Sequence, residues 1–492
     1  MTRSHGQLVR GLEYVPSSHI EEGRFGRLFR NVPIFRQDES DLLELGALMV
    51  SPREDDPTPE GQVDPEESSI PAGYTYVGQF VDHDLTFDPA STLDKFNDPN
   101  ALVNFRSPRF DLDSVYGRGP DDQPYLYDQQ HPDFPGLALL LGRDAKVRSA
   151  IEDQRDLPRN EQGRALLGDP RNDENIVVSQ LHAAVIRFHN AMLERVHAEQ
   201  PQLGHADLFK ETQRQVRWHY QWAVFHDFLP RIVGGDLAGE TLERAWNLRY
   251  YRPYGPGSFM PVEFSVAAYR FGHSMVRPEY RINSFVPPRI PIFSDEANPL
   301  VNLNGFRPLP DDWGFEWRFF FTGIGETTAD RPMQHAYRID THLVNPLGTL
   351  PGPAVAGLRS LAQRNLVRGL RLKLPSGQAV ARALRLPVLD EDELVAGGED
   401  GETPIADIGT GSLRGNAPLW YYILRESELR HEGNRLGAVG GKIVAEVFVG
   451  LLFADRLSYL RVDPDWRPDE ALCADGKTFG MADLLRFATG QQ

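Results

Sequence analysis

The sequence predicts a mainly α-helical protein with long irregular connections and little β-structure. Apolar residues recur with the 3.6-residue period of a helix in several segments, whereas strict β-type alternation is scarce. Proline (38 residues) and glycine (44 residues) are scattered along the 492 positions, with no internal repeat and no linker of the usual composition. We therefore expect a single domain over residues 1–492, with residues 1–20 as an N-terminal arm.

Five segments carry the helical period, and two others are typical of exposed loops. The helical segments are residues 77–85, 175–200, 263–278, 358–375 and 441–453. In each, apolar side chains return every three or four positions and so share one face. Pro278 ends the third segment, because proline cannot continue a helix. Residues 51–73 and 389–404 are rich in proline, aspartate and glutamate and are expected to be solvated loops.

The composition of the chain restricts the classes of partner and the cellular compartment that we expect. Seventy acidic residues against 52 basic ones give a formal net charge of −18, which argues against nucleic acid or an anionic membrane as the main partner. The single cysteine, Cys473, excludes an intrachain disulfide. No run approaches the roughly 18 apolar residues of a membrane span, and the first residues do not resemble a signal peptide. We expect a cytoplasmic protein, with signal-independent secretion left open and the oligomeric state undetermined.

The stretch GQFVDHDLTF, residues 78–87, places acids and a histidine among apolar side chains. Such groups are costly to bury unless something binds them. In a helix, Gln79 and His83 lie at i and i+4 with Asp82 beside them, while Asp84 points elsewhere. This geometry predicts that the two sides of the helix have different functions, one for Gln79, Asp82 and His83 and another for Asp84. The alternative is a hydrogen-bonded core histidine.

Three further segments carry candidate site residues. In RSPRFDLDSVYG (106–117), the side chains of Ser107, Asp111 and Asp113 and the carbonyl of Arg109 offer oxygens at alternate positions. Six to eight such oxygens suit Ca²⁺, and Asp84 could complete the set. The alternative is an ordinary Asp-rich turn.

In GDPRNDENIVV (168–178), Arg171 and Glu174 stand at the entry to a helix. Plain capping by Asp173 or Asn172 is the alternative, with Glu174 stabilising the positive end of the helix dipole. Capping gives no reason for Arg171, whose charge is unfavourable at that end.

In AYRFGHSMVRPEY (268–280), His273 falls inside an apolar helix, with Arg270 one turn before it. A neutral imidazole in such a place is a usual axial ligand for haem iron. Asn365 and Arg368 share a face of another helix, and an amide there could fix the far nitrogen of His273.

Taken in order, these motifs resemble those of the animal-type haem peroxidases, typified by myeloperoxidase and lactoperoxidase, a family with bacterial homologues. The shared motifs are Gln-x-x-Asp-His-Asp, Ser-x-x-x-Asp ending in Val-Tyr-Gly, Gly-Asp-x-Arg-x-x-Glu, a relaxed Arg-x-Gly-His, and Asn-x-x-Arg before Leu-Pro. The resemblance implies a helical myeloperoxidase-like fold forming one haem peroxidase domain. FHDFLPRIVGG (225–235) and FGMADLLRFATG (479–490) extend the match.

The resemblance also implies a role for each matched residue. His83 would be the distal histidine beside Gln79, and Arg171 the distal arginine. His273 would be the proximal iron ligand, supported by Asn365, with Arg270 and Arg368 facing the propionates or that asparagine. Asp82 and Glu174 would esterify the haem, and one Ca²⁺ would be bound by Asp84, Ser107, Arg109 (through its carbonyl), Asp111 and Asp113.

The activity implied is a haem-dependent peroxidase. It would reduce hydrogen peroxide and oxidise phenolic or aromatic donors, or (pseudo)halides, through a ferryl haem intermediate. The cofactors implied are haem b, or its ester-linked derivative, and one Ca²⁺. Asn175 stands where myeloperoxidase has its sulfonium-linked methionine, which removes that bond and brings strong chloride oxidation into question. Asp113 replaces a serine of the mammalian enzymes.

Three other functions are weighed against this one. A fatty-acid dioxygenase of the same superfamily needs a tyrosine three residues before the proximal histidine, where this chain has Arg270, with Tyr269 one step away. A non-catalytic haem or calcium-binding adhesion module has no need for His83 and Arg171. A zinc hydrolase would use His182 and His189, which share one helix face, but no further ligand stands at metalloprotease spacing, so we expect two core histidines instead.

Overall fold

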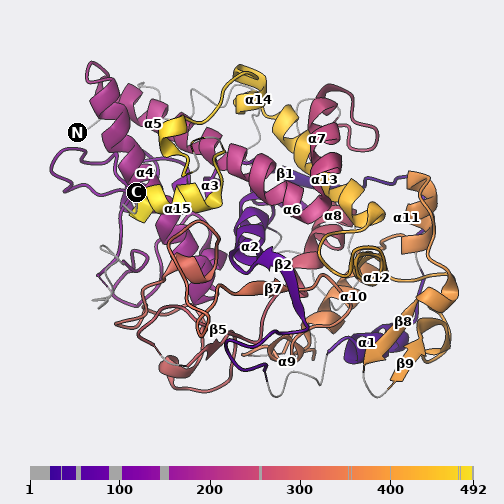
Figure 1. The fold of residues 1–492 in the computed structure, drawn as a ribbon. Helices are drawn as coiled ribbons and strands as arrows, with labels where there is room; N and C mark the ends of the chain where they lie inside the picture. The colour runs from indigo at the N-terminus through magenta and orange to yellow at the C-terminus, as the bar shows by residue number, and fades with distance from the viewer. Residues whose placement is uncertain are drawn as a thin grey trace.

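The computed structural model describes residues 23–34, 36–50, 57–87, 102–144, 155–253, 258–286, 288–352, 354–355, 357–398, 401–474, 476 and 478–489. The N-terminal arm expected at residues 1–20 lies outside the described residues. Helices dominate, and α2 lies near the centre of the molecule with longer helices around it (Figure 1). The expectation of a mainly α fold is confirmed, while the single domain over 1–492 stays a prediction.

The helices and strands have the following bounds. The α-helices are α1 Glu39–Leu48, α2 Gly73–Leu85, α3 Asp113–Tyr116, α4 Ile176–Glu199, α5 His205–Ala223, α6 Leu229–Val233, α7 Gly235–Glu243, α8 Val262–Ser265, α9 Asn345–Gly348, α10 Leu361–Arg371, α11 Gly377–Leu384, α12 Leu419–His431, α13 Ala438–Ala454, α14 Tyr459–Val462 and α15 Met481–Thr489. The 3₁₀ turns used below are η4 Pro170–Asp173 and η7 Ala268–His273. The strands are β1 Gly23–Gly26, β2 Glu67–Pro71, β3 Val103–Asn104, β4 Met260–Pro261, β5 Glu279–Tyr280, β6 Ile290–Pro291, β7 His335–Tyr337, β8 Val395–Gly398 and β9 Gly401–Pro404.

The strands of the described residues form one three-stranded sheet and three two-stranded sheets. β1 pairs with β3 antiparallel and with β4 parallel, and the pairs β2–β7, β5–β6 and β8–β9 are antiparallel. The pairs β2–β7 and β8–β9 correct the expectation that segments 51–73 and 389–404 are loops throughout. Residues 67–71 form β2 because Ser68 and its neighbours bond to β7, and residues 395–398 and 401–404 pair with each other as β8 and β9.

The longest helices form where the apolar period is strongest. α4 is buried nearly all round, and it packs against α2, α5 and α15. α13 is likewise apolar and packs against α12 and η7. α13 is apolar on nearly every face and so belongs in the interior. Together with the buried first part of α4 it packs against the elements that carry the site, α2 and η7. Among the described residues, no helix combines the length and apolar character needed to cross a membrane.

The helix expected over residues 263–278 is the main correction to the fold. It divides into α8 and η7, because Ala267 lies between them with φ −127° and ψ −72°, outside the helical region. Within η7 the N–H of Arg270 donates to the carbonyl of Ala267, three residues back, at 2.9 Å. The helices expected at 77–85, 175–200, 358–375 and 441–453 are confirmed as α2, α4, α10 and α13.

Candidate functional site

Helix α2 presents its polar side chains to two different neighbours. His83 and Asp84 are buried, and Gln79 and Asp82 are half-buried. Gln79 and His83 face the η4 segment, whereas Asp84 bonds to residues of the α3 loop. The expected division of the helix into two faces is therefore confirmed. Asp82 accepts a hydrogen bond from the Thr86 hydroxyl at 3.1 Å.

The His83 ring is held through Nδ1. That nitrogen lies 2.8 Å from Asn172 Oδ1, and Nε2 lies 3.6 Å from Glu174 Oε1. Burial, and next the charge of Arg171, lowers the pKa of His83 below its ordinary value. The ring is therefore neutral near pH 7 and has one bare nitrogen, as a general base requires.

Arg171 points back from the N-terminal side of α4 towards α2. Its Nη2 lies 2.8 Å from Asp169 Oδ2 and also donates to the carbonyl oxygens of His83 (3.2 Å) and Thr86. Asp169 is fully buried and also pairs with Arg106 Nε at 2.9 Å. Burial alone would raise the pKa of Asp169, but the hydrogen bonds and charge of Arg171 outweigh it and hold that pKa at about 2. The positive charge of Arg171, which is unfavourable at a helix N-terminus, is thus fixed beside His83.

The capping alternative is corrected by the structure. The α4 cap is Asn175, whose side chain accepts the N–H of Val178 at 2.9 Å. Asp173 instead pairs with Arg159 at 2.7 Å. Glu174 accepts a hydrogen bond from Gln79, so it lies on the His83 side of the segment rather than at the helix axis.

A second histidine, His273, lies half-buried at the end of η7. His273 Nδ1 is 2.7 Å from the amide nitrogen Nδ2 of Asn365 on α10. An amide can present either its oxygen or its nitrogen, and with the oxygen towards Nδ1–H the ring keeps a lone pair on Nε2. Burial, and next Arg270, lowers the pKa of His273 to about 3, so the imidazole is neutral. Arg270 itself donates to the carbonyl of Ser265 at 2.9 Å.

The two histidines belong to packed elements. η7 contacts α2, α12 and α13. A Cβ placed at Gly272, next to His273, would meet no atom within 4 Å, so open space adjoins this residue. Arg368 is half-buried, one turn after Asn365 on the same face of α10, as predicted.

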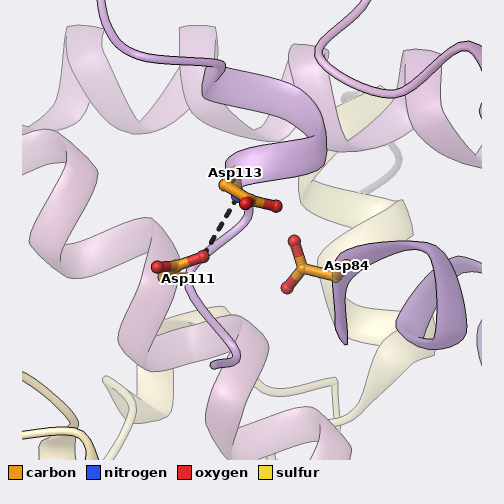
Figure 2. Close-up of side chains that lie close together, drawn as sticks. All are labelled: Asp84, Asp111 and Asp113. Carbon is orange, nitrogen blue, oxygen red and sulfur yellow. Dashed lines mark hydrogen bonds between the residues drawn. The ribbon is translucent and has the colours of Figure 1, made fainter. Parts of the chain in front are cut away.

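The carboxylates of Asp84, Asp111 and Asp113 point towards one another (Figure 2). One oxygen from each lies within 4.8 Å of the others. Leu112, between the two loop acids, has φ 58°, a left-handed conformation that is strained for a leucine. The Leu112 N–H donates to Asp84 at 3.1 Å, so the strained turn is tied to α2.

The electrostatics of this acidic triad call for a cation. Burial, and next the charge of Asp111, raises the pKa of Asp84 to about 7 and that of Asp113 well above its ordinary range. Arg106 Nη1, 3.6 Å from Asp113, is only a partial counter-charge. Ser107 donates to Asp111 at 2.8 Å, and Arg109 donates its N–H to the Ser107 carbonyl at 2.8 Å. A cavity of about 670 Å³ borders the loop and gives an ion access.

Sequence reasoning missed the contacts of Asn172 and treated His182 as a core residue. Asn172 Nδ2 lies 2.9 Å from His182 Nδ1, so Asn172 joins two buried histidines. His189 bonds instead to the Tyr116 hydroxyl (2.9 Å) and the Leu137 carbonyl (3.1 Å). Both its nitrogens are thus engaged, and within the described ranges His182 and His189 join no metal-ligating cluster, which counts against a zinc site.

The donor set fits haem. A neutral imidazole whose far nitrogen contacts an amide is suited to bind haem iron, and an imidazole with a nearby guanidinium is suited to exchange protons with peroxide. Oxygen ligands of the triad fit Ca²⁺. These two sites are joined by consecutive residues of α2, His83 and Asp84.

Comparison with known proteins agrees with this chemistry. Residues 91–292 match the family model described as animal haem peroxidase. Among related sequences is the chorion peroxidase of Drosophila melanogaster, 29% identical over 331 residues, which are 65% of this chain and 38% of that protein. The chain thus spans less than two-fifths of the length of the curated relatives that it matches.

Solved structures share the fold. Peroxidase A from Dictyostelium discoideum aligns with a TM-score of 0.60 at 15% identity, covering 95% of this chain and 92% of that one. A fatty acid alpha-dioxygenase from Arabidopsis thaliana aligns with a TM-score of 0.59 at 14% identity, covering 94% and 78%. At these identities the likeness concerns the fold alone.

Proposed function

We propose that this chain, which belongs to the animal haem peroxidase superfamily, is a haem-dependent peroxidase that reduces hydrogen peroxide and oxidises a small donor. The donors proposed are phenols and other aromatic compounds, or (pseudo)halides. The observation that carries the proposal is the position of Arg171, whose guanidinium is held by Asp169 against the backbone of His83. A protein that only binds haem has no use for a buried imidazole and a guanidinium fixed together.

The roles of the residues follow from their chemistry. Haem, when bound, supplies the redox chemistry, and His273 with Asn365 would hold its iron. His83 Nε2 takes a proton from peroxide as general base and returns it to the departing oxygen as general acid, so that water leaves. Arg171 stabilises the negative charge that develops as the O–O bond breaks. Gln79, bonded to Glu174 and Asn175, lies one helical turn before His83 on the same face of α2.

The acids are proposed to anchor the cofactor and the fold. Asp82 and Glu174 would form esters with haem, and acid–acetone extraction tests this directly. Haem that stays with the polypeptide supports the ester bonds, whereas haem that is freely extracted would show that they do not form. Asp84, Ser107, Arg109, Asp111 and Asp113 would bind one Ca²⁺, which ties α2 to the α3 loop.

The second candidate is a fatty-acid dioxygenase, since an enzyme of that kind from Arabidopsis thaliana shares the fold and this chain has a buried tyrosine, Tyr269, close to His273 in sequence. In a 3₁₀ turn, with three residues per turn, Arg270 lies in line with His273 and Tyr269 lies about 120° away. The Tyr269 hydroxyl is nevertheless buried without a hydrogen-bond partner. The position of Arg270 makes the peroxidase the better-supported function.

One experiment separates these functions. The full chain is loaded with haem and Ca²⁺, and peroxide consumption is measured with a phenol, an aniline, chloride, bromide and thiocyanate. A His83→Gln variant is the matched control. Peroxide-dependent donor oxidation that needs His83 supports the peroxidase. Uptake of dioxygen with palmitate, without oxidation of any donor, would show that the chain is a dioxygenase and not a peroxidase. If the haem-loaded chain turned over neither substrate, it would be a binding module.

A further inference from the structure

Asn172 links the candidate general base to a second histidine. Its Oδ1 lies 2.8 Å from His83 Nδ1, and its Nδ2 lies 2.9 Å from His182 Nδ1. All three side chains are buried, with at most 4% of each residue exposed. Both polar atoms of this amide therefore bond to imidazole rings. Neither caps helix α4, whose cap is Asn175.

The chemistry of the amide couples the two rings. Its oxygen only accepts and its nitrogen only donates, so one ring must carry a proton on Nδ1 while the other has Nδ1 bare. Burial lowers the pKa of His182 to about 3, so this ring is neutral and can accept at Nδ1. An amide that donates to His182 turns its oxygen to His83. His83 then carries its proton on Nδ1 and keeps the lone pair on Nε2.

The rings are also fixed in space. His182 lies on α4 and contacts the edge of Phe80 on α2, with ring centroids 6.0 Å apart and an angle of 70°. The N–H of Asn172 donates to the carbonyl of Asp169 at 3.2 Å, within the turn that carries Arg171. One short turn thus positions both the imidazole and the guanidinium.

We propose that Asn172 and His182 are positioning residues that hold the His83 ring in the tautomer with its proton on Nδ1, so that Nε2 faces peroxide as a bare base. This inference rests on the proposed function and specifies how its general base is prepared. Neither residue touches the reacting atoms. A wrong tautomer leaves a catalytic histidine correctly placed but unable to accept a proton.

Four variants test the inference. Asn172→Leu and His182→Phe remove the link, whereas Asn172→Asp keeps an oxygen for His83. Asn190→Leu is the matched control, because Asn190 is a half-buried α4 asparagine whose side chain, among the residues that the structure describes, bonds to the backbone of Leu139, at 2.8 and 3.0 Å. The full chain is labelled with ¹⁵N-histidine and carries zinc protoporphyrin, which is diamagnetic. The chain has 14 histidines, and the signals of His83 are assigned by their loss in His83→Gln.

The expected result is a single Nδ1–H tautomer of His83 in the unaltered chain, Asn172→Asp and Asn190→Leu, and mixed tautomers in the other two. In the haem-loaded chain, Asn172→Leu and His182→Phe should slow the reaction with peroxide about 10- to 100-fold, because part of the general-base effect is lost. Asn172→Asp should restore most of the rate.

Two outcomes would overturn the inference, and a third concerns the function instead. A His83 ring with its proton on Nε2 in the unaltered chain contradicts it. An unchanged tautomer and rate in Asn172→Leu, with His83→Gln slowed, contradicts it while leaving the peroxidase intact. If His83→Gln itself reacts with peroxide at the unaltered rate, the proposed function fails, whatever tautomer the spectra show.

Discussion

Arg171 Nη2 lies 2.8 Å from Asp169 Oδ2, and this carboxylate is fully buried while a quarter of the arginine side chain remains exposed. Arg106 approaches the same carboxylate at 2.9 Å. The acid therefore neutralises two cations and fixes the one that faces His83. Its removal would affect both the stability of the fold and the reaction with peroxide.

We predict that Asp169→Ala lowers the free energy of unfolding by about 3 kcal/mol, because two guanidinium groups lose a buried counter-ion. Urea unfolding measures this. The control is Asp407→Ala, which removes an exposed pair with Arg414 and should cost less than about 1 kcal/mol. Equal losses in the two variants would show that the Asp169 cluster is no stronger than a surface pair.

His83→Gln should slow the reaction with peroxide by about 10²- to 10⁴-fold, since the general base is removed. The haem should remain bound, because His273 and not His83 is its ligand in this account. Stopped-flow absorbance measures the rate, and the resting spectrum measures the haem. His226→Gln is the control, since His226 stacks on Trp222 with ring centroids 3.8 Å apart and takes no part in the site. Similar rates for the two variants would contradict the role of His83.

Ca²⁺ should stabilise the unaltered chain and not Asp84→Asn. A ligand at 100 times its dissociation constant contributes about 2.7 kcal/mol, which raises the melting temperature measurably. Thermal unfolding with Ca²⁺ and with a chelator checks this, and Asp407→Asn serves as a surface control. If Asp84→Asn gained as much stability from Ca²⁺ as the control, the ion would bind elsewhere.

Glu426 should make stability fall as the pH rises. Burial raises its pKa from 4.5 to about 7, although the N–H groups of Val439 and Gly440 act in the opposite direction. The folded-state pKa thus exceeds the unfolded one, so the contribution of Glu426 is complete below about pH 4.5 and is lost as the pH rises through 7. Glu426→Gln should flatten the unfolding free energy between these values, as measured in urea. Parallel curves for the two proteins would refute this.

The sequence predicts most of the site because its motifs are local. Gln79 and His83 share a helix face by their spacing alone, and the acids at 111 and 113 lie two positions apart in the loop that faces Asp84. The long apolar segments likewise predict α4 and α13. Such signals need only the period of a helix and the chemistry of neighbouring side chains.

What the sequence does not predict depends on distant contacts. Asn172 was weighed as a helix cap, yet its partner His83 lies 89 positions away. The break at Ala267 and the left-handed conformation of Leu112, whose N–H donates to Asp84, are not visible in the local hydrophobic period. His182 has the pattern of a core histidine, and only its contact with Asn172 distinguishes it.

Binding of haem through His273 is best tested by the absorption spectrum of the full chain supplied with haem, compared with that of His273→Ala. We predict a Soret band in the unaltered chain and its shift or loss in the variant, with recovery when imidazole is added. A full chain without a Soret band, or a band unchanged in His273→Ala, would contradict it.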